Sequence, residues 1–304
     1  MDAEVGGAKA FGTKKEFLKQ YKKKSRMREY YARFIKNKPA VIGLIIFTLI
    51  VLLALMAPLI ADYEAQAIKI DVPNRLNPPS MQNLLGTDEL GRDVLARLVH
   101  GARISLIIGI TSVGFGLAIS LVIGSISGFF GGRIDFVIMR VIDIFLCLPD
   151  VLLALAIVGA FGASQTNLII SIGIASIPWF SRIVRAAVMS VRSNEYVEAA
   201  RAIGARNGRI ITRHILINCI GFMTVQITMR VATAILTIST LSFIGLGIQS
   251  PQPEWGNMLA TGRTYMRDNA YLVLAPGLAT FFTILSLNLL GDGLRDTLDP
   301  RLKQ

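Results

Sequence analysis

Six stretches of this chain are long and apolar enough to cross a lipid bilayer. A transmembrane helix needs about 20 apolar residues to cross a hydrocarbon core roughly 30 Å thick. Only 17% of the 304 residues are charged and 53% are hydrophobic, which is typical of a polytopic membrane protein. We therefore predict an all-α membrane protein with six transmembrane helices. The predicted spans are Ala40–Ile60, Ile104–Phe129, Phe136–Val158, Leu168–Val188, Ile215–Leu246 and Leu272–Leu290.

Positive charge is distributed unevenly among the segments that flank these spans. Residues 1–38 contain twelve Lys or Arg, and the segment between the fourth and fifth spans is rich in Arg with two acids. The segments 61–103 and 247–271 are close to charge-balanced. Because basic loops stay on the cytoplasmic side, six spans place both termini in the cytoplasm.

The basic N-terminal tail suggests two kinds of partner, nucleic acid and anionic lipid. No nucleic-acid motif or aromatic platform accompanies the basic run, so we favour membrane lipid and expect no nucleic-acid partner. The first apolar stretch begins only near residue 39, behind this basic run, whereas a cleavable signal peptide would begin closer to the N-terminus. We therefore expect the stretch to be retained as a transmembrane helix.

These patterns divide the chain into five segments. Asp88, inside the third of them, is predicted to cap a short helix through Leu90, Val94 and Leu98, because these apolar residues recur at helical spacing. The segments are a cytoplasmic tail (1–38), a first transmembrane helix (39–61), an extracytoplasmic loop (62–103), a core with the remaining spans (104–295) and a C-terminal cytoplasmic tail (296–304).

A short amphipathic helix is predicted in the cytoplasmic segment between the fourth and fifth spans. Ser193 or Asn194 can cap a helix that starts at Glu195, and Gly204 can end it in a left-handed conformation. One predicted face carries Tyr196, Ala199, Ala200 and Ile203, whereas Glu195, Glu198 and Arg201 lie opposite. Helical geometry alone favours an ordinary loop helix on the lipid surface.

The sequence of this segment resembles a known family. Glu198-Ala199-Ala200, then Gly204 and Arg213-His214-Ile215-Leu216, are similar to the EAA loop of ATP-binding-cassette importer permeases. The resemblance implies a type I importer permease fold and a coupling helix, at about 195–205, that sits in a groove of the ATPase. The implied coupling residues are Tyr196, Glu198, Ala199, Ala200, Arg201, Ile203 and Gly204.

Five further blocks, in order, resemble the second permease of dipeptide, oligopeptide and nickel importers. The sequence departs from the family at Ile217, where proline is usual, and at Ile238, where an acid is common. The blocks are Leu85–Val94, Gly101–Ser105, Leu241–Gly247, Pro253–Leu259 and Gly291–Pro300. The resemblance implies a bacterial inner-membrane importer with a homologous permease, two ATPase subunits and an extracytoplasmic substrate-binding protein.

Several polar residues interrupt the predicted spans and are candidates for lining a transport path. Asp143 and Asp150 are seven residues apart in the third predicted span and so are expected on one helix face. For Asp143 we favour a structural pairing with Arg140 or with another subunit. Arg230 follows Gln226 by four residues, so both can point the same way. Arg230 is expected to meet either a peptide carboxylate or an acid of the partner permease. The candidate path residues are Asp150, Gln226 and Arg230.

Three functions remain open: an importer permease for di- or oligopeptides or for nickel or a nickel chelate, a membrane enzyme using Asp143, Asp150 and His100, and a scaffold. No phosphate-binding loop, nucleophile elbow or zinc-protease motif occurs, so we expect no catalytic residues and ATP hydrolysis on separate subunits.

Cys147 and Cys219 stand alone, and His100 and His214 are separated. No metal site and no cofactor are therefore predicted.

Overall fold

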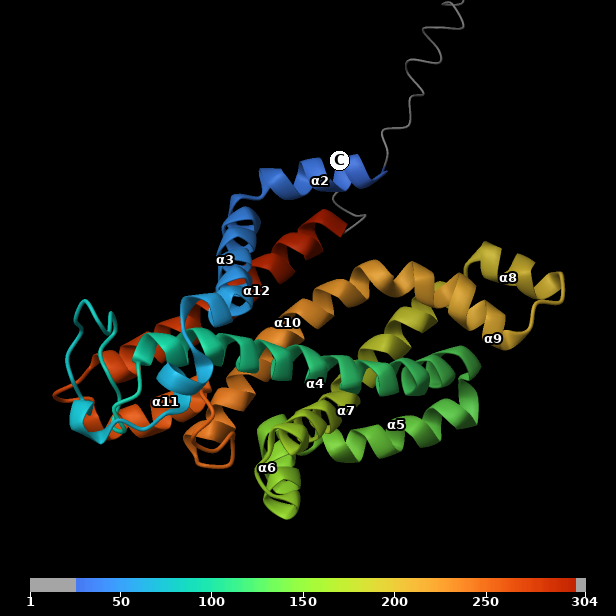
Figure 1. The fold of residues 1–304 in the computed structure, drawn as a ribbon. Helices are drawn as coiled ribbons and strands as arrows, with labels where there is room; N and C mark the ends of the chain where they lie inside the picture. The colour runs from blue at the N-terminus through green and yellow to red at the C-terminus, as the bar shows by residue number, and fades with distance from the viewer. Residues whose placement is uncertain (1–25, 299–304) are drawn as a thin grey trace, which may run out of the picture.

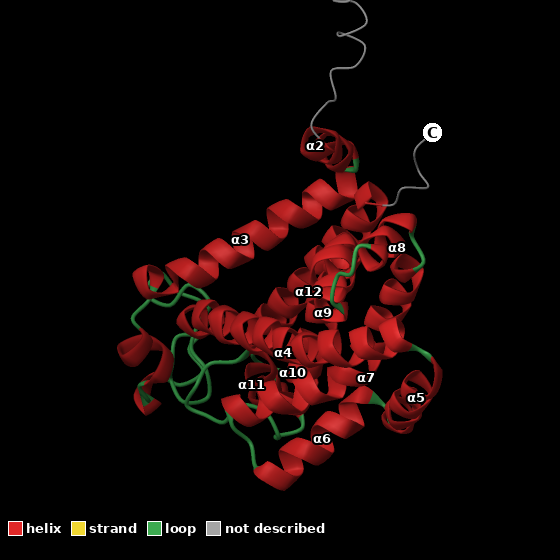
Figure 2. Ribbon diagram, turned by 90° about the vertical axis from the view of Figure 1, so that its right-hand side faces the viewer, coloured by secondary structure: helices red, strands yellow, loops and turns green. Residues whose placement is uncertain are grey.

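The computed structural model describes residues 26–298, and this part of the chain consists of helices joined by loops (Figure 2). Five segments are long and apolar enough to cross a membrane, and a bent pair of helices adds a sixth if it counts as one span. The prediction of an all-α polytopic protein is therefore confirmed. The five are α3 (Lys38–Ile60), α4 (Val94–Phe130), α7 (Gln165–Arg192), Asn207–Phe243, which contains α10 (Leu216–Phe243), and α12 (Tyr271–Leu298).

The placement of both termini in the cytoplasm stays a prediction. Most of the predicted N-terminal tail and residues 299–304 of the C-terminal tail lie outside the described residues.

The first described helices meet at Asn37, between α2 (Arg26–Lys36) and α3. The Asn37 side chain caps α3 by accepting a hydrogen bond from the Ala40 N–H at 3.2 Å. Its amide also donates to Asp296 near the end of α12, at 3.0 Å. The beginning and the end of the described chain are thus joined, as Figure 1 shows.

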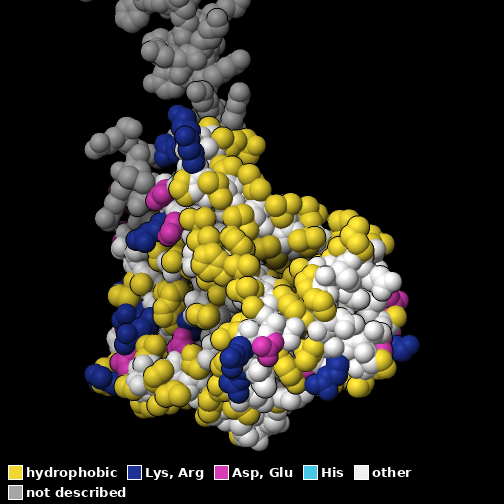
Figure 3. All heavy atoms as spheres, turned by 90° about the vertical axis from the view of Figure 1, so that its left-hand side faces the viewer, with side chains coloured by type: hydrophobic (Ala, Val, Ile, Leu, Met, Phe, Trp, Pro, Cys, Tyr) yellow, Lys and Arg dark blue, Asp and Glu magenta, His cyan; other side chains and the backbone are white. Residues whose placement is uncertain are grey.

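Helix α3 packs on α12 along one narrow side and leaves most of its surface apolar and exposed. A Cβ on Gly43 would lie 2.7 Å from the Leu289 Cβ, so the two helices approach closely. The outward side carries exposed leucines that include Leu52, Leu55 and Leu59. Such a surface suits lipid chains. Figure 3 shows apolar side chains over much of the upper and middle part of one face of the molecule, with Lys and Arg side chains at the top of this face and further charged side chains lower down.

Helix α4 packs lengthwise against α7 through small residues. A Cβ on Gly124 would lie 2.7 Å from the Ser181 carbonyl oxygen, and one on Gly128 would lie 2.8 Å from the Arg185 carbonyl oxygen. Gly124 and Gly128 therefore form a pair of small residues, one turn apart, at which the two helices pack closely.

The start of α4 differs from the prediction, and a helix capped by Asp88 is wrong. Asp93 is the cap, because its carboxylate accepts a hydrogen bond from the Ala96 N–H at 2.8 Å. Val94 and Leu98 belong to the first turns of α4 itself. Asp88 instead stays in the loop, where it accepts hydrogen bonds from the backbone and from arginines.

The third predicted span, Phe136–Val158, is broken into α5 (Gly132–Leu146) and α6 (Asp150–Phe161), which are bent by 82°. Pro149 lacks an N–H and disfavours helical backbone at Leu148, so the helix ends before it. The prediction that Asp143 and Asp150 share one helix face is therefore wrong.

The loops at the two ends of the bundle contain short helical elements. Figure 1 shows α8 and α9 at the end opposite to α11 and the loop after α3. These elements are a π-helix (Tyr63–Ile68), a 3-10 helix (Val72–Asn74), α8 (Glu195–Ala202), α9 (Asn207–Arg209), a second π-helix (Ile210–Ile215), α11 (Trp255–Gly262) and a second 3-10 helix (Arg263–Tyr265).

Candidate functional site

Helix α8 begins and ends close to the predicted positions. Asn194 occupies the cap position, but its side chain makes no capping hydrogen bond. Gly204 has a φ of +80°, a left-handed conformation that glycine adopts without strain. The Gly204 and Ala205 N–H groups donate to the carbonyls of Arg201 and Ala200 at 3.0 and 3.1 Å, which closes the helix end.

One side of α8 is fixed to its own chain. Val197 is 0% exposed and Ala200 is 5% exposed, and both belong to an apolar cluster with Val184, Ile210 and Ile215. The predicted face differs here, because Ala200 points inward together with Val197. A residue at position 200 larger than alanine would separate α8 from this cluster.

The other side of α8 is free in the described chain. Tyr196 is 42% exposed and Ile203 is 86% exposed, and Ala199 and Glu198 are also exposed. Arg201 is exposed too, with its guanidinium carbon 5.7 Å from the centre of the Phe129 ring. An exposed isoleucine beside a small residue and an acid offers a partner an apolar contact with a polar edge.

Ion pairs tie α7, which leads directly into α8, to α5. Arg185 donates from Nε and Nη2 to both carboxylate oxygens of Asp135, at 2.5 and 2.6 Å, and Ser127 donates to the same carboxylate. Arg182 pairs with Asp143 at 2.5 Å, and Arg140 approaches Asp143 at 4.0 Å. The predicted structural pairing of Asp143 with Arg140 is therefore present but longer than the contact with Arg182.

A second set of polar residues lies near the middle of α10. Arg230 donates from Nη2 to the Asp150 Oδ2 at 2.5 Å and from Nε to the Ser176 hydroxyl at 3.4 Å. Its guanidinium lies over the Trp179 ring, 5.3 Å from the centroid. Within the described chain the acid that meets Arg230 is Asp150, and a contact with a peptide carboxylate or with an acid of a partner permease stays a prediction.

Two of the predicted path residues are therefore brought together, although α6 and α10 are far apart in the sequence. The third, Gln226, is half-buried one turn before Arg230 on α10 and makes no hydrogen bond within the described residues. The α-helix continues unbroken past Ile217, where a proline would have removed a backbone hydrogen-bond donor.

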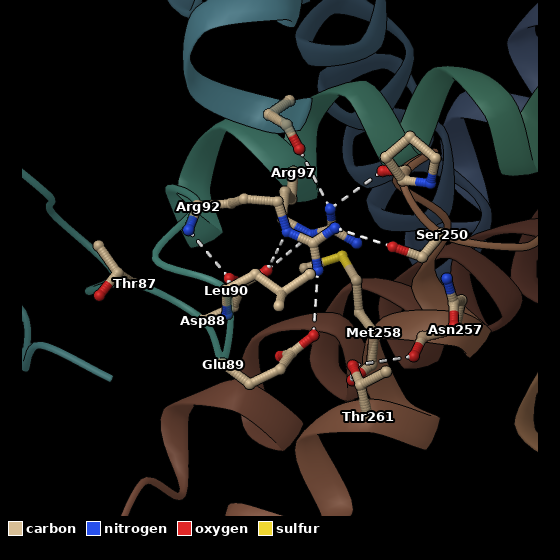
Figure 4. A network of polar contacts seen from close by, with 12 residues as sticks. Thr87, Asp88, Glu89, Leu90, Arg92, Arg97, Ser250, Asn257, Met258 and Thr261 are labelled. Atoms are coloured by element: carbon tan, nitrogen blue, oxygen red, sulfur yellow. Dashed lines mark hydrogen bonds and ion pairs between the residues drawn. The ribbon is translucent and has the colours of Figure 1, made fainter. Parts of the chain in front are cut away.

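The opposite end of the bundle is closed by a network of buried charges (Figure 4). Asp88 pairs with Arg92 at 2.7 Å and with Arg97 at 3.3 Å, while Arg92 also meets Glu89 at 3.0 Å. Arg92 donates to the Ser250 hydroxyl at 3.1 Å, and Arg97 donates to the Pro251 carbonyl oxygen at 3.2 Å. Two loops distant in the sequence are thereby joined.

Glu254 is 0% exposed and caps α11 by accepting hydrogen bonds from the backbone N–H groups of Gly256 and Asn257 at 2.8 and 2.9 Å. Burial raises the pKa of Glu254, and these hydrogen bonds oppose that effect in part. The neighbouring Trp255 donates its indole N–H to the Leu98 carbonyl oxygen of α4 at 3.0 Å. Helix α11 is therefore attached to α4 through polar contacts.

The structure identifies two features that sequence reasoning missed. Val197 anchors α8, and its spacing of three residues from Ala200 was a usable signal. The burial of Glu254 and Arg97 had no such signal, because charged residues in a loop or at the start of a span usually lie in water.

Two family models match the chain. The binding-protein-dependent transport system inner membrane component matches residues 120–304. The N-terminal transmembrane domain of oligopeptide transport permease C matches residues 25–79.

Curated relatives extend the likeness over most of the chain. The dipeptide transport system permease protein of Alkalihalophilus pseudofirmus is 43% identical over 93% of each chain. The di/tripeptide transport system permease protein of Pseudomonas aeruginosa is 44% identical over 92% of this chain and 93% of its own. The glutathione transport system permease protein of Shigella flexneri is 44% identical over 90% of each chain.

A solved structure has a similar fold. An inward-facing methionine ABC transporter matches 66% of this chain and 96% of its own chain, with a TM-score of 0.55 and 18% sequence identity. The likeness at this identity concerns the fold, and it confirms the predicted importer permease architecture.

Proposed function

Because the chain belongs to the binding-protein-dependent transport system inner membrane components, we propose that it forms the peptide pathway of an ATP-driven importer. It is a multi-pass permease of the inner membrane, and ATP hydrolysis in this family lies with separate subunits. The family also implies a second permease and a binding protein.

The exposed side of α8 is the observation that carries the coupling role. Val197 and Ala200 anchor α8 in the apolar cluster, whereas Tyr196, Ala199 and Ile203 stay exposed. A partner that binds the exposed side can therefore displace α8 together with the helices it packs on. Helix α8 lies between the ends of α7 and α10, and α7 is tied to α5 by ion pairs. Closure of the ATPase subunits would therefore move several spans together.

The charged residues near the membrane centre support a location for the path. Asp150 is 38% exposed and Gln226 is half-buried, whereas the outward side of α3 is apolar. A partly exposed charge inside a span faces water or a protein partner, because lipid would penalise it. We assign the α6–α10 side to the path shared with the second permease, with Asp150, Gln226 and Arg230 along it.

The names of the relatives support small peptides as the substrate. The test is uptake of radiolabelled di- and tripeptides, and separately of nickel, by cells that carry or lack this permease. Loss of peptide uptake on deletion, restored by the intact gene, is the expected result. Unchanged peptide uptake with loss of nickel uptake would overturn the peptide assignment.

The coupling role is tested by placing the same charge on the two sides of α8. Ile203→Asp should leave the complex assembled but lower uptake at least tenfold, because an exposed apolar contact becomes an acid facing the ATPase. Val197→Asp should prevent assembly, since it buries an unpaired charge. Normal uptake by the assembled Ile203→Asp complex would contradict a coupling role for α8.

A further inference from the structure

The Arg230–Asp150 pair lies where an isolated charge is most costly. Arg230 is near the middle of α10, a helix of 28 residues, and its side chain is 10% exposed. A charge at this depth must remain paired or meet water or another ion. Any motion that separates α6 from α10 therefore requires a replacement for Asp150.

Contacts with Asp150, Ser176 and Trp179 restrict the orientation of the Arg230 guanidinium, and some of its N–H groups make no hydrogen bond within the described residues. Its central carbon lies over the Trp179 ring, 5.3 Å from the centroid, and only Nε and Nη2 donate hydrogen bonds to the protein within the described residues. A cation over an aromatic ring is attracted to the ring face, so Trp179 and the two hydrogen-bond acceptors together restrict the orientation of the guanidinium. The Nη1 group is thus available to an incoming acceptor.

A small cavity adjoins the pair and is lined by small or polar side chains, among them Ala175, Ser176, Ala234 and Thr237. Asp150, with 38% of its side chain exposed, forms another part of the lining. The pair is therefore approached from the partly open side on which Asp150 lies.

The two partners depend on each other unequally. Asp150 is the first residue of α6, where the helix N-terminus also stabilises a carboxylate. Arg230 has no second acidic partner in the described chain. Asp150 also lies next to the bend at Pro149, on a helix of 12 residues that is too short to span a bilayer alone. Asp150 can thus leave with α6, whereas Arg230 then requires another anion.

We propose that Arg230 binds the C-terminal carboxylate of the transported peptide, and that Asp150 occupies this position when no substrate is present. Arginine and carboxylate form two parallel hydrogen bonds, so a peptide carboxylate can replace Asp150 with a geometry that is at least as good. This inference rests on the proposed function, because it names the group of the peptide that the permease recognises.

The test compares trialanine with trialanine amide in proteoliposomes that contain the complete importer and its binding protein. The ratio of the two initial uptake rates is measured at sub-saturating peptide, so that discrimination by the binding protein cancels between variants. Arg230→Gln should lower the acid-to-amide ratio about tenfold, the value of one charge-assisted hydrogen bond. Asp150→Asn should raise the ratio several-fold, because the competing carboxylate is gone.

Asp143→Asn is the matched control, because it removes a carboxylate of similar exposure, 36% against 38%, that also pairs with an arginine at 2.5 Å. Its acid-to-amide ratio should equal that of the wild type. A charge swap, Asp150→Arg with Arg230→Asp, keeps the pair but should reverse the preference for the acid.

The outcomes separate the two levels of inference. If the wild-type importer takes up neither peptide, the proposed function fails. If it takes up trialanine and both single variants keep the wild-type ratio, or the swap restores that ratio, the pair is only structural and the role of Arg230 in recognition is overturned. The single variants decide the question if the swap does not assemble.

Discussion

The two ends of the helical bundle hold their charges in opposite ways. At the end near α11, the side chains of Arg92 and Arg97 are 1% and 2% exposed. The ion pairs between α7, which leads into α8, and α5 are more exposed: Arg182 and Asp143 are 56% and 36% exposed, and Arg185 and Asp135 are 30% and 18% exposed. Buried charges must all be satisfied together and so fix one geometry, whereas exposed pairs are inexpensive to break. The α8 end is therefore better suited to moving during transport.

The largest expected effect is the loss of stability when a buried arginine is removed, compared with the loss when an exposed one is removed. Arg97→Ala should destabilise the complex by about 3–5 kcal/mol, because it removes one of the two arginines paired with the buried Asp88 and takes a hydrogen-bond donor from the carbonyl oxygens of Ala67 and Pro251. Arg182→Ala should cost less than about 1 kcal/mol, as expected for an exposed pair. Thermal unfolding of the purified complex measures both.

Equal losses of stability in these two variants would contradict the comparison. Retention of normal complex levels in the membrane by the Arg97→Ala variant would do so as well.

An intermediate effect is expected from the pH dependence that Glu254 introduces. Burial raises the pKa of Glu254 above its ordinary value of 4.5, so the folded protein binds this proton more tightly than the unfolded chain. The resulting stabilisation is full below pH 4.5 and is lost as the pH rises through the raised pKa. Glu254→Gln cannot titrate. The wild type should therefore lose stability relative to Glu254→Gln by up to about 1.4 kcal/mol per pH unit in that window.

The measurement is the melting temperature of both complexes in a pH series that starts near 4.5. A difference between the two proteins that stays constant across the series would show that the buried carboxyl does not titrate as expected.

The smallest expected effect concerns the end of α8. Gly204→Ala should destabilise the helix end by about 1 kcal/mol, because φ is +80° and alanine is strained there. Gly208→Ala is the matched control: neither glycine has an atom within 4 Å of an added Cβ, and Gly208 lacks the positive φ.

Hydrogen exchange of the α8 amides should become roughly fivefold faster in Gly204→Ala, the equivalent of 1 kcal/mol, and remain unchanged in Gly208→Ala. Similar rates in both variants would indicate that the left-handed residue does not limit α8.

The sequence predicted those structural elements whose formation depends only on residues close to one another in the chain. Apolar runs gave the spans, and Gly204 gave the end of α8, because hydropathy and backbone conformation act over a few residues. The break at Pro149 was not predicted, although proline was a visible signal, since the apolar run continues across it. Asp88 was wrongly assigned as a cap because two aspartates, Asp88 and Asp93, compete for the same helix start.

The sequence by itself determined that this protein is a helical membrane permease with a short helix between its fourth and fifth predicted spans. The tertiary structure alone decided which polar groups from distant parts of the chain meet. Asp150 and Arg230 are 80 residues apart, and Arg97 and Pro251 are 154 apart. Hydropathy is a property of each segment, whereas an ion pair depends on where two helices cross and on how much water reaches them, and no local pattern specifies either.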